Sequence, residues 1–172
     1  MTSISTVVGV TGHIHFNESG TQEFRFAVNK LLTELEKKSP INRPSLACGF
    51  AAGADLEVAS IAFSRHWPLI AVLAGPRIEV EFEYVDGKTK ALFSDLLSSA
   101  SEIIVAAPSG TTSPEKYCMV GAKIIELSED LIAIWDGDTS TPKLGGTAWV
   151  VDKFLNTKTQ SSSGFHSIVV TR

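Results

Sequence analysis

The stretch ACGFAAGAD, residues 47–55, decides the fold class of this chain. A short apolar run leads into it, and apolar residues at helical spacing follow it. The same order recurs in residues 130–147, where an apolar run is followed by Asp136-Gly137-Asp138 and Gly145-Gly146-Thr147. Small residues let a ligand approach the backbone, and a helix start offers free N–H groups to an anion. Both segments therefore predict strand–turn–helix units with an anion-binding turn.

Strands and helices are expected to alternate along the whole chain. The patterns predict strands at 6–11, 45–48, 68–74, 102–107, 131–135 and 168–170. They also predict helices between these strands. A capping box at 19–22 opens the first helix, and the second begins at residue 53. The others are expected around 92–97, at 113–128 with Ser113 as N-cap, and at 145–155. The acidic stretch 77–87 is expected to be irregular. Because the strands are continuously apolar, we expect a doubly wound, mostly parallel α/β sheet of about six strands with helices on both faces, a Rossmann-like fold.

Four turns are expected to meet at one edge of this sheet. Right-handed crossovers bring the carboxyl ends of parallel strands to the same side. On that rule the turns at 12–13, 49–55, 74–77 and 136–147 form a single crevice, which suits a phosphorylated ligand.

Length and composition limit the class of protein. The 172 residues suit a single domain over 1–172, with 44% hydrophobic and 20% charged residues. The net charge of −4 disfavours binding to nucleic acid. No apolar stretch is long enough to cross a membrane, and residues 1–6 lack the pattern of a secretory signal. With Cys48 and Cys118 as the two cysteines, we expect a reduced, cytoplasmic protein without a metal site.

Two common nucleotide motifs are missing from the chain. The first turn reads Gly9-Val10-Thr11-Gly12-His13, which is not a dinucleotide fingerprint, and no P-loop sequence occurs. We therefore expect neither an ordinary NAD enzyme nor a P-loop kinase, and no cofactor.

The segment after the second strand offers a phosphate or ribose cradle. Gly49, Gly53 and Ala54 would leave the helix start open, and Asp55 would bind a ribose hydroxyl. A tight turn with an acidic residue in the first helical turn has the same composition, because the helix dipole favours that charge. The pattern leaves both interpretations open.

The segment after the fifth strand offers a second cradle. Gly145, Gly146 and Thr147 would wrap a phosphate, although a plain connection capped by Thr147 would look alike. Asp136, followed by Gly137, would orient a ribose or a water, while paired aspartates are also ordinary turn formers.

Aromatic and imidazole groups would flank a base. Gly12 and His13 end the first strand, and His13 would stack on a base or move a proton. Together with His15 it makes a weak metal site, which we do not expect to be used. Trp135 would offer a stacking platform, unless it belongs to the core like most strand tryptophans.

The remaining polar candidates come from three further segments. Tyr117 lies early in a helix, where its hydroxyl would reach the same edge. Arg77 and Lys143 are the cations of the convergent loops and are therefore expected to pair with phosphate.

These segments resemble the SLOG superfamily. The resemblance rests on residues 8–13 and 52–55, on Tyr117 with Gly121, and on residues 130–137 through 145–147, and it spans about residues 7–151. This superfamily includes DNA-processing protein A-like domains, the "lonely guy" phosphoribohydrolases and nucleotide sensors of bacterial conflict systems. The resemblance implies a Rossmann-like fold that binds a nucleotide or nucleotide-derived signal, and it implies homo-oligomers.

The chain departs from that family pattern at two positions. Val150 stands where the phosphoribohydrolases carry a glutamate three residues after their threonine, so their catalytic carboxylate is missing. Ile14 stands where many members have an arginine after Gly-His, which removes an expected anion contact.

Three hypotheses follow for the function. The first is binding of a nucleotide-derived small molecule, with a separate effector chain as partner because no effector domain lies within these residues. The second is hydrolysis of the N-glycosidic bond of nucleoside monophosphates, with Asp55 and Asp136 as the carboxylates. The third is a structural subunit with an empty crevice.

Overall fold

The apolar runs form six strands that make one parallel sheet. The computed structural model describes residues 6–84, 86–140, 142–158 and 164–172, so the N-terminal residues 1–5 lie outside the described residues. The sheet order is β4-β3-β2-β1-β5-β6, and each pair of neighbours is parallel. The strands are β1 (Val7–Gly12), β2 (Ser45–Cys48), β3 (Leu69–Leu73), β4 (Glu102–Val105), β5 (Asp130–Trp135) and β6 (Phe165–Val169). The expected parallel α/β sheet is confirmed.

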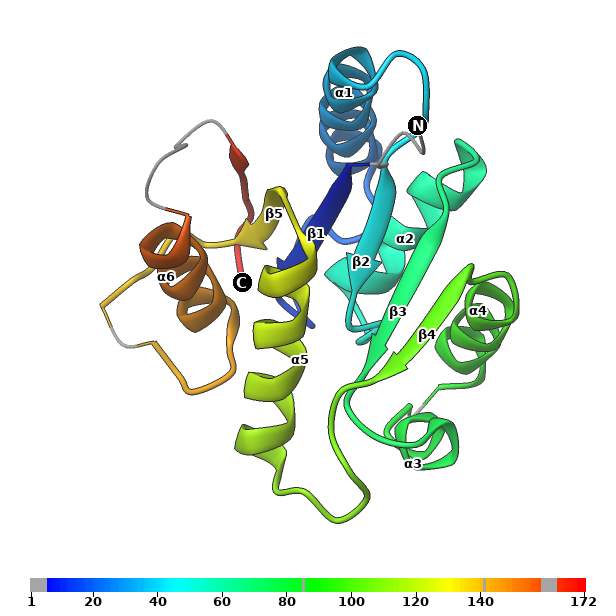
Figure 1. The fold of residues 1–172 in the computed structure, drawn as a ribbon, viewed down its shortest axis with the longest axis vertical. Helices are drawn as coiled ribbons and strands as arrows, with labels where there is room; N and C mark the ends of the chain where they lie inside the picture. Colours follow the sequence, from blue (N-terminus) through cyan, green and yellow to red (C-terminus); the bar gives the residue numbers. More distant parts are fainter. Residues whose placement is uncertain (1–5, 85, 141, 159–163) are drawn as a thin grey trace.

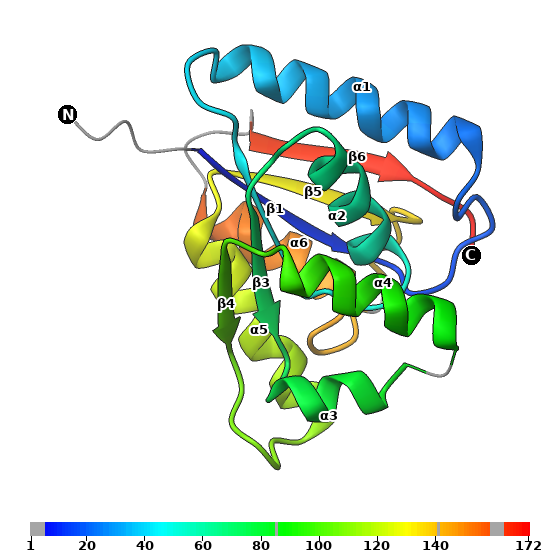
Figure 2. The same cartoon turned by 90° about the vertical axis from the view of Figure 1, so that its right-hand side faces the viewer.

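Helices cover both faces of the sheet, as Figures 1 and 2 show. On one face lie α1, α2 and α4, and on the other lie α5 and α6. The helices are α1 (Gln22–Lys38), α2 (Ala54–Ser64), α3 (Arg77–Phe82), α4 (Gly87–Ser98), α5 (Ser113–Leu127) and α6 (Thr147–Thr157). The inner strands β1, β2, β3 and β5 are therefore largely buried on both sides, which explains why they are apolar without alternation, while the edge strands β4 and β6 keep exposed residues.

Two layers of core lie on the two sides of the sheet. Val8, Val10 and Leu46 pack with the helices of the first face, while Val72 and Leu131 pack with α5 and α6 on the second. All five side chains are fully buried. This packing holds the carboxyl ends of the strands rigidly, and the turns that leave them build the site described below.

Helix α1 begins later than the capping box predicts. Thr21 is the N-cap, because its extended backbone lets its hydroxyl accept the N–H of Phe24 at 3.2 Å. Gly20, at φ +73°, separates Ser19 from the helix, and the Ser19 hydroxyl donates instead to the carboxylate of Glu57. The prediction that Ser19 opens the helix was wrong, because the side chain of a residue on α2 competes for its hydroxyl.

The stretch expected to be irregular contains a short helix. Residues 77–82 form α3, which the Arg77–Glu81 ion pair at 2.8 Å and the burial of Val80 stabilise. A run of acidic residues obscured the buried position of Val80 in the sequence pattern. Helix α5 is capped by Thr112 rather than by Ser113, so its start differs by one residue from the prediction.

Candidate functional site

A cavity of about 610 Å³ lies at the carboxyl edge of the sheet. Its wall is built from every turn that was expected to converge, and from one face of α5. The lining residues are Val10, Thr11, Gly12, His13, Ile14, His15, Gly49, Ala51, Asp55, Ala74, Tyr117, Val120, Gly121, Ile124, Asp138, Lys143, Leu144, Gly145, Gly146, Thr147, Ala148, Val150 and Arg172. A cavity of this size suits a small organic ligand.

The structure brings eight of the fourteen predicted ligand residues to this wall. These are Gly12, His13, Gly49, Asp55, Tyr117, Gly145, Gly146 and Thr147. The other six do not line it, and they are Gly53, Ala54, Arg77, Trp135, Asp136 and Gly137.

Gly53 and Ala54 hold the protein together at the start of α2. A β-carbon on Gly53, whose φ is +82°, would lie 2.1 Å from the carbonyl oxygen of Ile14. The N–H of Ala54 donates to the carbonyl of His13 at 3.1 Å, and its methyl group is buried against Gly12. These residues are small because the turn after β1 lies directly on them, so they serve chain packing where a ligand contact was expected.

Asp55 is a buried carboxyl group on the cavity wall. It is the second residue of α2, its residue is 7% exposed, and its Oδ2 accepts the N–H of Ala51 at 3.4 Å. Burial raises the pKa of Asp55 to about 7, against the opposing hydrogen bonds from the N–H groups of Ala51 and Gly49. Near neutral pH this group can therefore either donate or accept a hydrogen bond.

The start of α6 presents backbone to the cavity. Gly146 is the N-cap and makes no side-chain capping bond, and its own N–H donates to the carbonyl of Lys143 at 2.9 Å. Gly145, at φ +76°, packs so closely on α5 that a β-carbon would lie 2.9 Å from Cβ of Tyr117. The first N–H groups of an 11-residue helix thus remain for an anion.

Tyr117 is held in the wall by a carboxylate from outside it. Its hydroxyl donates to Glu83 at 3.1 Å, and Lys116 also pairs with Glu83. Burial raises the pKa of Tyr117, and the charge of Glu83 adds to this effect. These contacts tie the segment after α3 to α5 and fix one side of the cavity.

Arg77 and Trp135 lie elsewhere for separate reasons. Arg77 bonds Glu81 and the hydroxyl of Ser94, both away from the cavity. Trp135 is 5% exposed, packs with Val151, and donates its indole N–H to Ser167 at 2.9 Å. The ring therefore belongs to the core between β5, β6 and α6.

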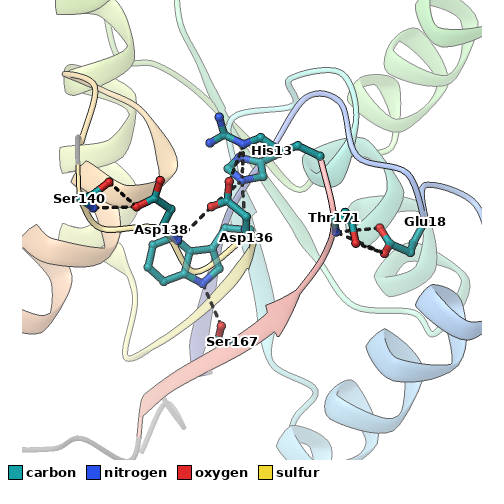
Figure 3. A network of polar contacts seen from close by, with 9 residues as sticks. His13, Glu18, Asp136, Asp138, Ser140, Ser167 and Thr171 are labelled. Atoms are coloured by element: carbon teal, nitrogen blue, oxygen red, sulfur yellow. Dashed lines mark hydrogen bonds and ion pairs between the residues drawn. The ribbon is translucent and has the colours of Figure 1, made fainter.

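His13, Asp136 and Arg172 form a polar cluster at the end of β5. Nε of Arg172 lies 2.7 Å from Oδ2 of Asp136 and 3.1 Å from Nε2 of His13. The backbone N–H of Asp136 also donates to that histidine nitrogen at 3.1 Å, as the dashed lines between His13 and Asp136 in Figure 3 show. The N–H of Asp138 lowers the pKa of Asp136, and the charge of Arg172 acts in the same direction. The Asp136 carboxylate is thus ionised, and Arg172 and the N–H of Asp138 hold it.

Sequence reasoning missed Arg172. The rule applied to the other strands could have found this residue, since residues that follow a parallel strand leave at its carboxyl edge. β6 pairs with β5 in parallel, and residues 170–172 therefore emerge beside Asp136.

The described residues contain neither a candidate metal site nor a candidate membrane span. Within the ranges that the structure covers, no three His, Cys, Asp or Glu side chains are grouped so that they could hold a metal ion. In the same ranges, no helix has the length and apolar character that crossing a bilayer requires.

The fold and cavity define a parallel, Rossmann-like α/β protein with a ligand-sized cavity at the carboxyl edge of its sheet. No protein-family model and no curated protein matches the chain. Solved structures similar to it include the structural genomics target TM1055, at 14% identity over 75% of this chain and 60% of that one, with a TM-score of 0.45.

Two further solved structures are similar to this chain. DNA processing protein A from Streptococcus pneumoniae is 13% identical over 96% of this chain and 59% of its own, with a TM-score of 0.46. The Moco carrier protein from Chlamydomonas reinhardtii is 13% identical over 96% of this chain and 90% of its own, with a TM-score of 0.40. The chain spans about three fifths of the first two proteins, at 60% and 59%.

Proposed function

We propose that this protein binds a nucleotide or nucleotide-derived small molecule in the cavity at the carboxyl edge of its sheet. The observation that carries the proposal is the composition of one wall. There the start of α6, which has no side-chain cap, lies next to Lys143 in a cavity of about 610 Å³. Backbone N–H groups and a nearby cation are what a phosphate needs.

The other walls suit the uncharged parts of such a ligand. Val120, Ile124 and Leu144 supply apolar surface for a base, in place of the Trp135 ring. Asp55 offers a polar group for a ribose hydroxyl or a ring nitrogen. A few polar groups among apolar ones are typical of small-molecule sites. The sequence resemblance, which implies a nucleotide ligand, points in the same direction.

Calorimetry with a panel of nucleotides tests the proposal. The panel holds the four nucleoside monophosphates, ADP, ATP, ADP-ribose and cyclic ADP-ribose, and the four unphosphorylated nucleosides. We expect at least one phosphorylated member to bind and to raise the melting temperature. Lys143→Gln should weaken that binding, and Ala148→Leu should weaken it further by filling the cavity next to the α6 start.

A matched control separates the site from general charge effects. Lys88 is exposed on α4 and does not line the cavity, so Lys88→Gln should leave binding unchanged. The proposal is wrong if no panel member binds and mass spectrometry of the heat-denatured protein finds no released nucleotide. It is also wrong if Ala148→Leu folds normally and binds like the original protein.

N-glycosidic hydrolysis is a second candidate, favoured by Asp55. A general acid works best with a pKa near the operating pH, and that of Asp55 is raised to about 7. Asp136, the other expected carboxylate, does not line the cavity and pairs with Arg172. Chromatography of the same panel for free base, with Asp55→Asn as the comparison, distinguishes turnover from binding alone.

A further inference from the structure

Arg172 is a cation on the cavity wall that the resemblance and the sequence patterns leave unexplained. We propose that its guanidinium binds the phosphate of the ligand, and that Asp136 and His13 act as positioning residues for it. This inference rests on the proposed nucleotide-binding function and adds to it a specific anion contact. It also gives Asp136 a role different from the ribose or water contact expected of it.

The backbone around Arg172 is held firmly. The N–H of Val170 donates to the carbonyl of Trp135 at 2.9 Å, which continues the ladder between β5 and β6. Glu18 accepts the N–H of Thr171 at 3.0 Å and its hydroxyl at 2.8 Å, a pair of contacts visible in Figure 3. The contacts with Glu18 tie Thr171 to the loop between β1 and α1.

A second pair of bonds closes the same connection. The N–H of Asn17 donates to the carbonyl of Thr171 at 2.8 Å, and its side-chain amide donates to the carbonyl of Arg172 at 2.9 Å. The Arg172 backbone therefore has a defined position at the cavity, and little conformational freedom is left for a ligand to remove.

The Arg172 side chain is held at Nε, while its two terminal nitrogens make no contact with the described residues. Its contacts with the described residues, to Asp136 and His13, are both made by Nε. The two terminal amino groups therefore keep their N–H donors, and 62% of the side chain is exposed to solvent. A guanidinium held in this way presents the two-pronged face that matches phosphate oxygens.

Two carboxylates lie near the Arg172 guanidinium. The charge of Asp136 is balanced by the contact to Nε at 2.7 Å. Asp138 lines the cavity, but its Oδ1 accepts the N–H of Ser140 at 2.8 Å and the hydroxyl of Ser140 at 2.7 Å, as Figure 3 shows. Protein donors thus hold both carboxylates, and the contact of Arg172 with Asp136 is made by Nε, which leaves the terminal amino groups of the guanidinium facing away from that ion pair.

Paired titrations of nucleotides and nucleosides test the assignment. The probes are AMP, GMP, CMP and UMP with their four unphosphorylated nucleosides, measured by calorimetry. In the original protein the phosphate should increase affinity. Arg172→Gln should remove about tenfold of nucleotide affinity or more while nucleoside affinity stays the same, because only the phosphate meets the guanidinium. The nucleotide affinity of Arg172→Lys should fall between those of the original protein and Arg172→Gln.

A double-mutant cycle tests the positioning role. Asp136→Asn should reduce nucleotide affinity when Arg172 is present and have no further effect in the Arg172→Gln background. Equal losses in both backgrounds would overturn it. Arg25 is exposed and does not line the cavity, so Arg25→Gln is the matched control and should bind normally.

The nucleotide-binding function and the role of Arg172 would be contradicted by different results. If no nucleotide binds the original protein, the nucleotide-binding function is wrong, and the role of Arg172 is wrong with it. If nucleotides bind and Arg172→Gln, folded with an unchanged melting temperature, binds them equally well, the function stands and the Arg172 assignment is overturned.

Discussion

Gly53 lies directly against the backbone of Ile14, so that a β-carbon on Gly53 would come within 2.1 Å of the Ile14 carbonyl oxygen. The same β-carbon would lie 2.8 Å from the carbonyl oxygen of His13. The turn after β1 thus rests on the residue that caps α2, and both segments continue into the cavity wall. A residue expected to touch ligand instead sets the distance between two parts of that wall.

Gly53→Ala should therefore destabilise the protein strongly. The glycine has a φ of +82° and its clash is with backbone, which cannot move aside as a side chain would. We expect a loss of roughly 3 kcal/mol or more in the free energy of unfolding, measured by urea denaturation. Gly110→Ala is the matched control, since Gly110 has a φ of +80° with nothing within 4 Å, and about 1 kcal/mol is expected there. Equal losses at the two positions would contradict the packing role.

Asp55→Asn should change how stability depends on pH. The pKa of Asp55 is about 7 in the folded protein and near 3.8 without burial, so the folded state binds the extra proton between these values. Stability from this group is therefore fully present below pH 3.8 and is lost as the pH rises from there to about 7. The difference corresponds to about 4 kcal/mol at most.

The comparison of the two proteins isolates this group. Urea denaturation at pH 3 and pH 8 should find similar stabilities at pH 3, with Asp55→Asn the more stable protein at pH 8. All other carboxyl groups are shared and cancel in the difference. A gap between the two proteins that does not change with pH would show that Asp55 is not a buried, titrating group.

Glu36→Gln should loosen the contact between α1 and the end of α2. The carboxylate accepts from Arg65 Nη2 at 2.8 Å, Trp67 Nε1 at 2.8 Å and Arg43 Nη1 at 2.7 Å. Burial acts to raise the pKa of Glu36, but the bonds from Arg65 and Trp67 outweigh it and hold the pKa below its usual range. We expect a loss of about 2 kcal/mol in thermal or urea unfolding. Glu34→Gln, on an exposed position of the same helix, should cost almost nothing.

Trp135→Phe tests whether Trp135 belongs to the core or to the ligand site. The substitution removes the indole N–H that donates to Ser167 at 2.9 Å and shrinks a side chain that is 5% exposed. Stability should fall by about 1 kcal/mol, and the affinity for any nucleotide that binds should stay the same. A large loss of affinity at unchanged stability would restore the role of Trp135 as a stacking platform.

The alternation of strands and helices was readable from local patterns. Continuous apolar runs such as 131–135 reflect burial on both sides of a strand, and the parallel order then places the turns on one edge. That is why Gly12, Asp55 and Thr147 were expected at one crevice and do line one cavity. Local patterns were therefore enough to predict the class of fold and the edge at which the cavity opens.

Which side chains face that cavity was decided by tertiary contacts alone. Gly53 meets Ile14 across 39 positions of sequence, and Arg172 meets Asp136 across 36 positions. Small residues in a turn have the same composition whether they admit a ligand or another segment of the chain, so no local pattern separates the two. Periodicity reports which residues are buried, whereas the direction of a turn residue depends on what packs against it from elsewhere in the fold.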